Sequence, residues 1–372
     1  MKILLIGEAS FLHNTLKKAL VERGNSVTTM SDGNGWHNAP RDIDLKRDMR
    51  WGKLSGLKVV WQLLRHMPKL CGNDIVQIHN YQFVPLMYGW NTLLLRFLKL
   101  TNRRVVKGCF GDDPQIMTRQ AMGVPPYSDT FWNGREQNAS LNRERMAEVM
   151  HPGAVAAWRS TSQMADALVP CLYEYWLAYN VEPFASKLHY IPLPMTMPTD
   201  DKIKVKGMAD TIKVLVGIQP KRDFIKGAMR IAGFVETVAR RHPGKIDIKY
   251  VEGVAYDEYM RMLDDADVLV DQLYSYTPSM NSLAAMARGT VVIGGGEDDY
   301  YRFIGETRLR PIINVSPELT DEENTAAIER AFFTEGALRR MSGESVAFAR
   351  KYHDNRHVAE LYENLYRSLL AK

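Results

Sequence analysis

The stretch MKILLIGEASFLHNTLKKALVERGNSVTTMS, residues 1–31, decides the fold. It begins with the apolar run KILLIG (2–7), continues with a helical pattern over 11–23, and ends with the alternating segment SVTTMS (26–31). A strand, a helix and a second strand in this order predict a parallel sheet, because a crossover helix is the usual connection between parallel strands. The first half of the chain is therefore expected to be a doubly wound α/β domain.

Further apolar runs continue this pattern. We expect strands in DIVQIH (74–79), RVVKGCFG (104–111), ADALVP (165–170) and KLHYIPLP (187–194). In an open parallel sheet, the carboxyl ends of the strands form the ligand-binding edge. Gly7, His79 and Asp112 are therefore predicted to share one edge of one sheet.

The alternation stops at a polar stretch and then starts again. The new series comprises predicted strands at 212–218, 246–253, 266–272 and 290–295, with helices near 225–241, 256–265 and 279–288. We therefore predict two Rossmann-like doubly wound domains facing each other across a cleft. Their predicted bounds are 1–196 for the N-terminal domain, 197–211 for a linker, 212–345 for the C-terminal domain, and 346–372 for C-terminal helices that pack back on the N-terminal domain.

Length and composition agree with two soluble domains. The chain has 372 residues, 45% of them hydrophobic and 24% charged, with a formal net charge of +5. Its three cysteines form no CxxC pair, and its histidines show no metal-ligand spacing, so neither a disulfide framework nor a metal site is expected. Nothing at the start has the pattern of a signal peptide, and no apolar run is long enough to span a membrane. The expected location is the cytoplasm.

Positive charge is concentrated in residues 46–104, which carry 11 Lys and Arg against 2 Asp. Tryptophan and leucine residues alternate with these cations, a composition suited to an anionic membrane surface. An ordinary amphipathic helix, with its apolar stripe in the core and its charges in solvent, is the alternative. Nucleic acid is not an expected partner, because no nucleic-acid-binding module accompanies the charge.

The loop after the first strand does not match a dinucleotide site. A nicotinamide enzyme would have GxGxxG there, and the three positions hold Gly7, Ala9 and Leu12. Asp32 lies at the position of the ribose-binding acid, so the sequence matches the dinucleotide pattern at only one of three glycines and at the acid. We interpret the loop as a turn facing the cleft, with Ser10 as the N-cap of the first helix.

Three stretches of the second half resemble a known family. They are KVLVGIQPKRDFIKGA, KYVEGVAYDEYMRMLDDADVLVDQ and SLAAMARGTVVIGGGED, within 212–298. They are similar to the donor-binding half of GT-B glycosyltransferases, especially the retaining family-4 type. The first half agrees more loosely, through its opening stretch, DIVQIHNY and GDDP. The resemblance implies transfer of a sugar from a nucleotide-diphosphate donor, without a bound metal or other cofactor.

The resemblance also implies which residues bind the donor. Without a metal, side-chain cations and helix N-termini must neutralise the leaving diphosphate. By resemblance, Arg222 (or Lys221) and Lys226 of KRDFIKG take this role; solvated surface charge is the alternative. The segment with Ser279, Met280, Asn281 and Ser282 would contact the donor sugar and phosphate, although Ser and Asn also serve as simple helix caps.

One departure from the family pattern stands out. The family has two glutamates separated by seven residues, and here Tyr276 and Ala284 occupy those positions. The ribose contact and the polar contact to the donor sugar are therefore missing from their usual places. In VEGVAYDEY (251–259), the resemblance implies a backbone contact from Val254 to the nucleotide base, with Tyr256 beside it; a core or capping role for Tyr256 is the alternative.

Catalytic candidates in the first half follow strand ends. His79 could donate to a phosphate or to an acceptor hydroxyl, or could be a buried histidine bonded to the backbone. Asp112 or Asp113 could accept the acceptor's proton, or could cap a helix before Pro114. No side-chain nucleophile is assigned.

These observations favour a metal-independent, retaining glycosyltransferase of GT-B architecture. Its partners would be a nucleotide-sugar donor and a glycan or lipid-linked acceptor, in surface or exported glycan synthesis at the inner membrane face. The alternatives are a sugar-nucleotide epimerase, a non-catalytic glycan-assembly protein, and a nicotinamide oxidoreductase.

Overall fold

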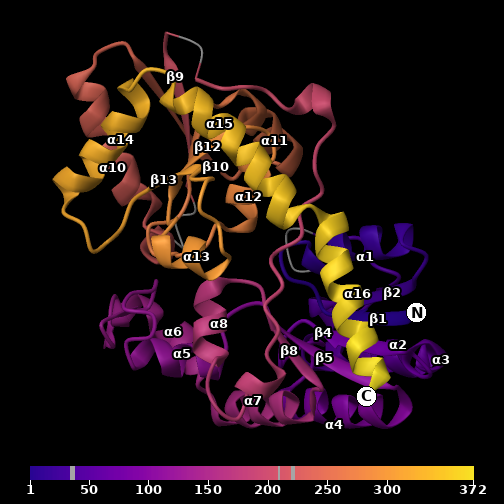
Figure 1. Ribbon diagram of the computed structural model, residues 1–372. Helices are drawn as coiled ribbons and strands as arrows, with labels where there is room; N and C mark the ends of the chain where they lie inside the picture. The colour runs from indigo at the N-terminus through magenta and orange to yellow at the C-terminus, as the bar shows by residue number, and fades with distance from the viewer. Residues whose placement is uncertain (34–37, 208–209, 219–222) are drawn as a thin grey trace. The chain divides into compact units, whose positions relative to one another are not determined.

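A computed structural model describes residues 1–33, 38–207, 210–218 and 223–372. The chain divides into two compact units, each with its own parallel sheet (Figure 1). Unit 1 comprises Met1–Met122, Asn142–Pro194 and Asn355–Lys372, and unit 2 comprises Gly123–Leu141 and Met195–Asp354. Two α/β units of this kind confirm the predicted fold class.

The sheet of unit 1 has six strands in the order β3-β2-β1-β4-β5-β8, all parallel. The strands are β1 Lys2–Ile6, β2 Ser26–Ser31, β3 Ile43–Asp44, β4 Ile75–Ile78, β5 Arg104–Cys109 and β8 Ala167–Pro170. Both faces of β1 are buried: Ile3 and Leu5 belong to one core cluster, and Leu4 and Ile6 belong to another. This explains why β1 is a nearly continuous apolar run.

Helices cover both faces of this sheet. The helices of unit 1 are α1 Leu12–Glu22, α2 Ser55–Arg65, α3 Met67–Leu70, α4 Tyr88–Thr101, α5 Pro114–Ala121, α7 Pro152–Met164, α8 Tyr173–Tyr179 and α16 Asn355–Ala371, and α6 Ala139–Val149 begins in unit 2 and continues into unit 1. α1 and α16 share the cluster on one face, whereas α2 and α4 share the cluster on the other. The C-terminal helix α16 is therefore part of unit 1, where it lies beside α1.

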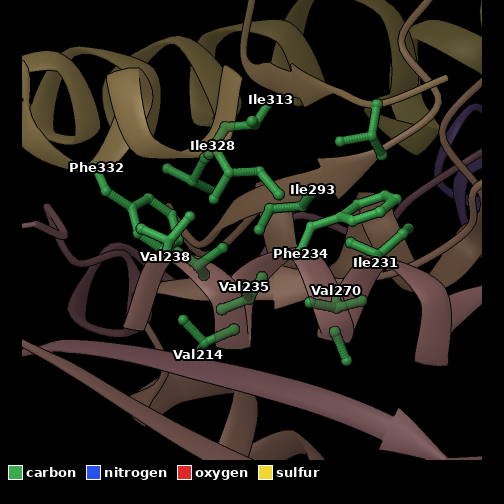
Figure 2. Packing of buried hydrophobic residues seen from close by; sticks show 14 of the residues in the cluster. Val214, Ile231, Phe234, Val235, Val238, Val270, Ile293, Ile313, Ile328 and Phe332 are labelled. Atoms are coloured by element: carbon green, nitrogen blue, oxygen red, sulfur yellow. The ribbon is translucent and has the colours of Figure 1, made fainter. Parts of the chain in front are cut away.

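The sheet of unit 2 has five parallel strands in the order β10-β9-β11-β12-β13. They are β9 Ile212–Ile218, β10 Ile246–Glu252, β11 Val268–Val270, β12 Val291–Gly294 and β13 Ile312–Asn314. The helices are α9 Asp223–Lys226, α10 Ala228–Arg241, α11 Tyr256–Asp265, α12 Met280–Met286, α13 Asp298–Phe303, α14 Asp321–Phe333 and α15 Ala337–Phe348. Figure 2 shows the main core of this unit, where valines and isoleucines of the strands meet the apolar stripes of α10 and α14.

The division of the chain differs from the sequence prediction at three points. Residues 123–141, with the hairpin β6 (Phe131–Trp132) and β7 (Arg135–Glu136), belong to unit 2 rather than to the N-terminal domain. The last boundary falls after Asp354 rather than near 345. The expected linker is partly packed on unit 2, because the main-chain amide of Lys206 donates to Ser342 Oγ at 3.0 Å and the Lys206 side chain is buried.

One predicted strand is absent. Residues 187–194 form no strand, and only Leu188 makes a single bridge, to Leu168 of β8. Pro192 and Pro194 explain this, since proline lacks the amide that a ladder needs. In the part of the chain that the structure describes, no helix is long and apolar enough to cross a membrane.

A buried carboxylate makes the stability of unit 2 depend on pH. Glu306 Oε1 accepts from the amides of Arg308 (2.7 Å) and Leu309 (3.0 Å), and Oε2 accepts from Lys351 Nζ (2.7 Å) and the hydroxyl of Tyr352 (2.9 Å). Burial raises the pKa of Glu306, but these bonds outweigh burial and bring the pKa down to about 2. The ionised form is thus favoured in the folded state, and its contribution is lost as pH falls from the unfolded value toward about 2.

We therefore expect Glu306→Gln to lower the free energy of unfolding by about 1–3 kcal/mol near neutral pH, as for loss of a charged hydrogen bond. The difference from the wild type should shrink as the pH falls below about 4.5. Urea titrations over a pH series measure it, with Glu335→Gln, an exposed carboxylate of the same unit, as the control. A difference that stays constant with pH would contradict the role of the Glu306 charge.

Candidate active site

The carboxyl edge of the unit 1 sheet brings together the residues predicted to meet there. Gly7 follows β1, His79 follows β4, and Asp112 lies beyond β5, the next strand in the sheet. Gly7 has φ 82°, and a Cβ at this position would lie 1.8 Å from His79 Nδ1. Glycine is therefore required at this position, because any side chain would displace the imidazole.

His79 is a neutral imidazole at this edge. Its ring is half-buried, its Nδ1 has no hydrogen-bond partner, and burial lowers its pKa to about 4. The side chain therefore carries no charge near neutral pH. It can exchange a hydrogen bond with a phosphate or hydroxyl, but it supplies no net charge to hold an anion.

The two aspartates after β5 differ in role. The carboxylate of Asp112 is half-buried and lies 2.7 Å from the guanidinium of Arg145. Asp113 is fully buried: one oxygen accepts from the amide of Ile116 at 3.0 Å, and the other accepts from the hydroxyl of Tyr179. Asp113 is thus the N-cap of α5, the structural alternative given above, and Asp112 is the more accessible carboxylate.

The prediction that Ser10 caps the first helix is wrong. Ser10 is exposed with φ 49°, the N-cap position is Phe11, and no side chain at that position bonds to the helix. Instead, Glu8 reaches forward, and its carboxylate accepts from the amides of His13 (3.1 Å) and Asn14 (3.0 Å). Burial raises the pKa of Glu8 to about 7 against the effect of these amides.

This arrangement bears on the nicotinamide alternative. In dinucleotide folds, the first helix start binds the pyrophosphate. Here the protein's own carboxylate already accepts from those amides. A pyrophosphate would have to displace Glu8, so this loop does not support a dinucleotide site.

At the carboxyl edge of unit 2, Lys226 is fixed by its backbone. Its carbonyl accepts from the amide of Leu273, which follows β11, at 2.8 Å. The next residue, Gly227, has φ 67°, and a Cβ there would lie 2.9 Å from both Leu273 and Tyr274. The Lys-Gly pair therefore lets the chain pass close to the β11 edge, and the glycine cannot be replaced without strain.

The side chain of Lys226 is half-buried and makes no hydrogen bond or ion pair with another described residue. Its charge is thus available to a ligand at this edge. Lys221 and Arg222, the other two cations predicted to bind the diphosphate, lie outside the described residues.

The serine and asparagine candidates surround a carboxylate that the motif analysis did not assign. Asp271, buried just after β11, accepts from Ser279 Oγ at 2.7 Å and from Ser282 Oγ. Asn281 in turn accepts from the hydroxyl of Tyr259 at 2.9 Å. These side chains therefore neither cap α12 nor point freely to a ligand; Asp271 holds them in place. Met280, the first residue of α12, is half-buried.

Tyr276, at the position of the family's first glutamate, is covered by the segment that joins unit 2 from the first half. Its ring stacks on Tyr127 at 4.3 Å between centroids, and the hydroxyl of Tyr127 donates to Glu297 at 2.7 Å. Both tyrosines are buried, with 5% and 1% exposure. In this conformation Tyr276 cannot contact a donor sugar unless Tyr127 moves. The two tyrosines are 149 residues apart in the chain, so no local sequence pattern predicts their contact.

The remaining candidates lie at the β10–α11 junction. Val254 is half-buried, and Tyr256 is 50% exposed at the first residue of α11. The core alternative for Tyr256 is therefore wrong, and its ring is accessible. Among the described residues, no group of three or more His, Cys, Asp or Glu has a metal-binding arrangement.

Solved structures with the GT-B fold match this chain over nearly its whole length, so its two α/β units have that fold. HepE of Anabaena, solved in complex with UDP and glucose, has 12% identity and a TM-score of 0.58, with 99% of this chain and 100% of that chain covered. Starch synthase IV of Arabidopsis thaliana, bound to ADP and acarbose, has 12% identity, a TM-score of 0.59, and coverage of 100% and 99%.

A sucrose-phosphate synthase of Thermosynechococcus elongatus has 14% identity and a TM-score of 0.56, with 100% of this chain and 99% of that chain covered. No family model matches the sequence, and no curated protein matches it. The chain thus has the fold of GT-B glycosyltransferases, as the sequence resemblance predicted, at a sequence distance where the likeness concerns the fold.

Proposed function

We propose that this chain is a glycosyltransferase that moves a sugar from a nucleotide-diphosphate sugar to an acceptor. The observation that carries the proposal is the placement of Lys226: in a GT-B fold, a cation without a partner among the described residues lies at the carboxyl edge of the second sheet. Ligands of open parallel sheets bind at this edge. Complexes of the same fold with UDP and glucose, and with ADP and acarbose, support a nucleoside diphosphate as the ligand.

In this proposal, side-chain cations replace a metal. The diphosphate that leaves during transfer is stabilised by positive charge placed in advance. Lys226 would supply one such charge, and by resemblance Arg222 and Lys221 would supply others. Because no carboxylate stands at positions 276 and 284, the donor sugar and ribose must be held by other groups, of which the accessible Tyr256 and the backbone at Val254 are candidates.

We further propose a retaining reaction on a glycan or lipid-linked acceptor, in surface or exported glycan synthesis at the inner membrane face. Asp112 is the candidate to contact an acceptor hydroxyl, since it is the less buried of the two aspartates. Neutral His79, at the same edge, would contact the phosphate or hydroxyl through a hydrogen bond.

The test is a thermal-shift panel of nucleoside diphosphates, nucleotide sugars and NADH. A ligand at 100 times its Kd stabilises the fold by about 2.7 kcal/mol, so one base series should raise the melting temperature by several degrees. A shift with NADH and with none of the nucleotide sugars would overturn the proposal in favour of an oxidoreductase.

Turnover separates the remaining alternatives. Chromatography of the best donor with a mixed glycan acceptor pool should show nucleoside diphosphate release that depends on the acceptor. A changed nucleotide sugar without transfer indicates an epimerase, and tight binding without turnover indicates a non-catalytic protein.

A further inference from the structure

Exposed apolar side chains gather in one segment of unit 1. Of the large apolar side chains that are exposed in the described chain, half lie between residues 49 and 100. We call this set the apolar surface: Met49, Trp51, Leu54, Leu57, Trp61, Leu64, Met87, Trp90, Leu93 and Leu100. The concentration is unusual, because isolated apolar side chains are normal on a surface but clusters mark interaction sites.

Helix α2 carries two apolar stripes. Val59 and Leu63 are buried against the sheet, whereas Leu57, Trp61 and Leu64 are 62%, 51% and 60% exposed. The exposed residues follow the spacing i, i+4, i+7, so they form one face of the helix. The alternative prediction, in which the apolar stripe simply faces the core, accounts for the first stripe and leaves the second unexplained.

Helix α4 repeats this arrangement beside the same sheet face. Leu95 and Leu98 are buried in the cluster that also contains the inner side of α2, whereas Trp90 and Leu93 are 52% and 56% exposed. Because α2 and α4 pack on the same core cluster, their exposed side chains lie on the solvent side of one helical layer, where Leu93 also borders a hollow against α7. The two outer stripes can therefore meet one partner together.

Cations that form no ion pair with a described carboxylate accompany these stripes. Lys58, Arg65 and Arg96 are exposed, and none of them forms an ion pair with a carboxylate in the part of the chain that is described. The guanidinium of Arg65 lies 5.0 Å from the ring centre of Trp61, so a cation and an exposed tryptophan are held next to each other. Other cations of the segment are already paired, such as Lys99 with Asp166 and Arg103 with Asp74.

We propose that the apolar surface, with these cations, binds the surface of an anionic phospholipid bilayer. Tryptophan and leucine enter the boundary between headgroups and acyl chains while lysine and arginine contact anionic headgroups. A second copy fits poorly, because a twofold contact would place this strongly basic segment against itself. Nucleic acid would pair with the cations but would leave the leucines without an apolar environment. Bilayer binding goes beyond the transferase proposal, since it requires no donor.

The test is flotation of the full chain with vesicles of phosphatidylcholine alone and of phosphatidylcholine with one third phosphatidylglycerol. We expect binding to the anionic vesicles only, weakening strongly at about 0.5 M salt because exposed charges are screened. Each cation near the surface adds about fivefold to the partition coefficient. Lys58→Glu with Arg65→Glu should therefore reduce binding at least tenfold, and Trp61→Ser with Leu64→Ser should reduce it at every salt concentration.

The matched control is Lys245→Glu with Lys249→Glu, two exposed lysines of unit 2, which should bind vesicles like the wild type. Circular dichroism melts confirm that each variant is folded. Absence of binding at low salt, equal binding to neutral and anionic vesicles, or equal loss in the control would overturn the proposal. So would concentration-dependent self-association in sedimentation that Trp61→Ser abolishes, because that would identify a second copy as the partner.

Discussion

Replacing Lys226 with alanine is expected to weaken binding of the nucleoside diphosphate by about 10- to 100-fold, the equivalent of losing one charge-assisted hydrogen bond. The side chain makes no hydrogen bond or ion pair with another described residue, so its removal breaks none. Its backbone carbonyl bonds to Leu273, and that bond persists in the alanine variant. The loss should therefore appear in binding and leave stability nearly unchanged. Titration calorimetry with the diphosphate selected by the thermal-shift panel measures it.

Two further variants make this result specific. Lys226→Arg keeps the charge and should retain much of the affinity, whereas Lys245→Ala removes an exposed lysine elsewhere in unit 2 and should change nothing. If Lys226→Ala binds the diphosphate with unchanged affinity, Lys226 does not contact the diphosphate. In that case the GT-B fold would stand, but the proposed diphosphate site would not.

Strands were predictable where their sequence pattern is clear. The runs at 26–31 and 212–218 match β2 and β9 residue for residue, because the first alternates, the second is largely apolar, and polar residues flank both. The short strand β13 (Ile312–Asn314) was not predicted, since three residues give no periodicity. Assignment of residues 123–141 to unit 2 depends on contacts such as Tyr127 with Tyr276, which local sequence cannot show.

The sequence predicted that the candidate site lies at the carboxyl edge of the parallel sheet, but it predicted the roles of individual residues less well. Topology alone places Gly7, His79 and Asp112 together, because the carboxyl ends of adjacent parallel strands coincide. The role of Glu8 was missed because its carboxylate reaches the helix from an earlier loop position, while Ser10 has the better capping chemistry but a left-handed backbone. Asp271 was not assigned a role from the motifs, because its serine contacts depend on the fold of the loop that follows β11.

Replacing Asp113 with alanine is expected to lower the free energy of unfolding of unit 1 by about 3–5 kcal/mol, because it removes one of two opposite charges that share a buried hydrogen-bond network through Tyr179. Lys107 is fully buried, and its Nζ donates to Ser162 Oγ at 2.7 Å and contacts the hydroxyl of Tyr179 at 3.4 Å. That hydroxyl donates to Asp113 and accepts from Trp158 Nε1 at 2.8 Å. Burial raises the pKa of Asp113 and lowers that of Lys107, so each charge depends on the other.

The neighbouring aspartate is the natural control, because the same substitution at Asp112 removes only a half-exposed ion pair with Arg145 and should cost about 0–1 kcal/mol. The double variant Lys107→Met with Asp113→Ala should lose less than the sum of the two single losses, since it leaves no unpaired charge in the core. Urea unfolding of the wild type, the three single variants Asp113→Ala, Asp112→Ala and Lys107→Met, and the double variant measures these differences. If Asp113→Ala costs no more than Asp112→Ala, the buried pair does not hold this edge of the sheet, and Asp113 would again be a candidate for contact with the acceptor.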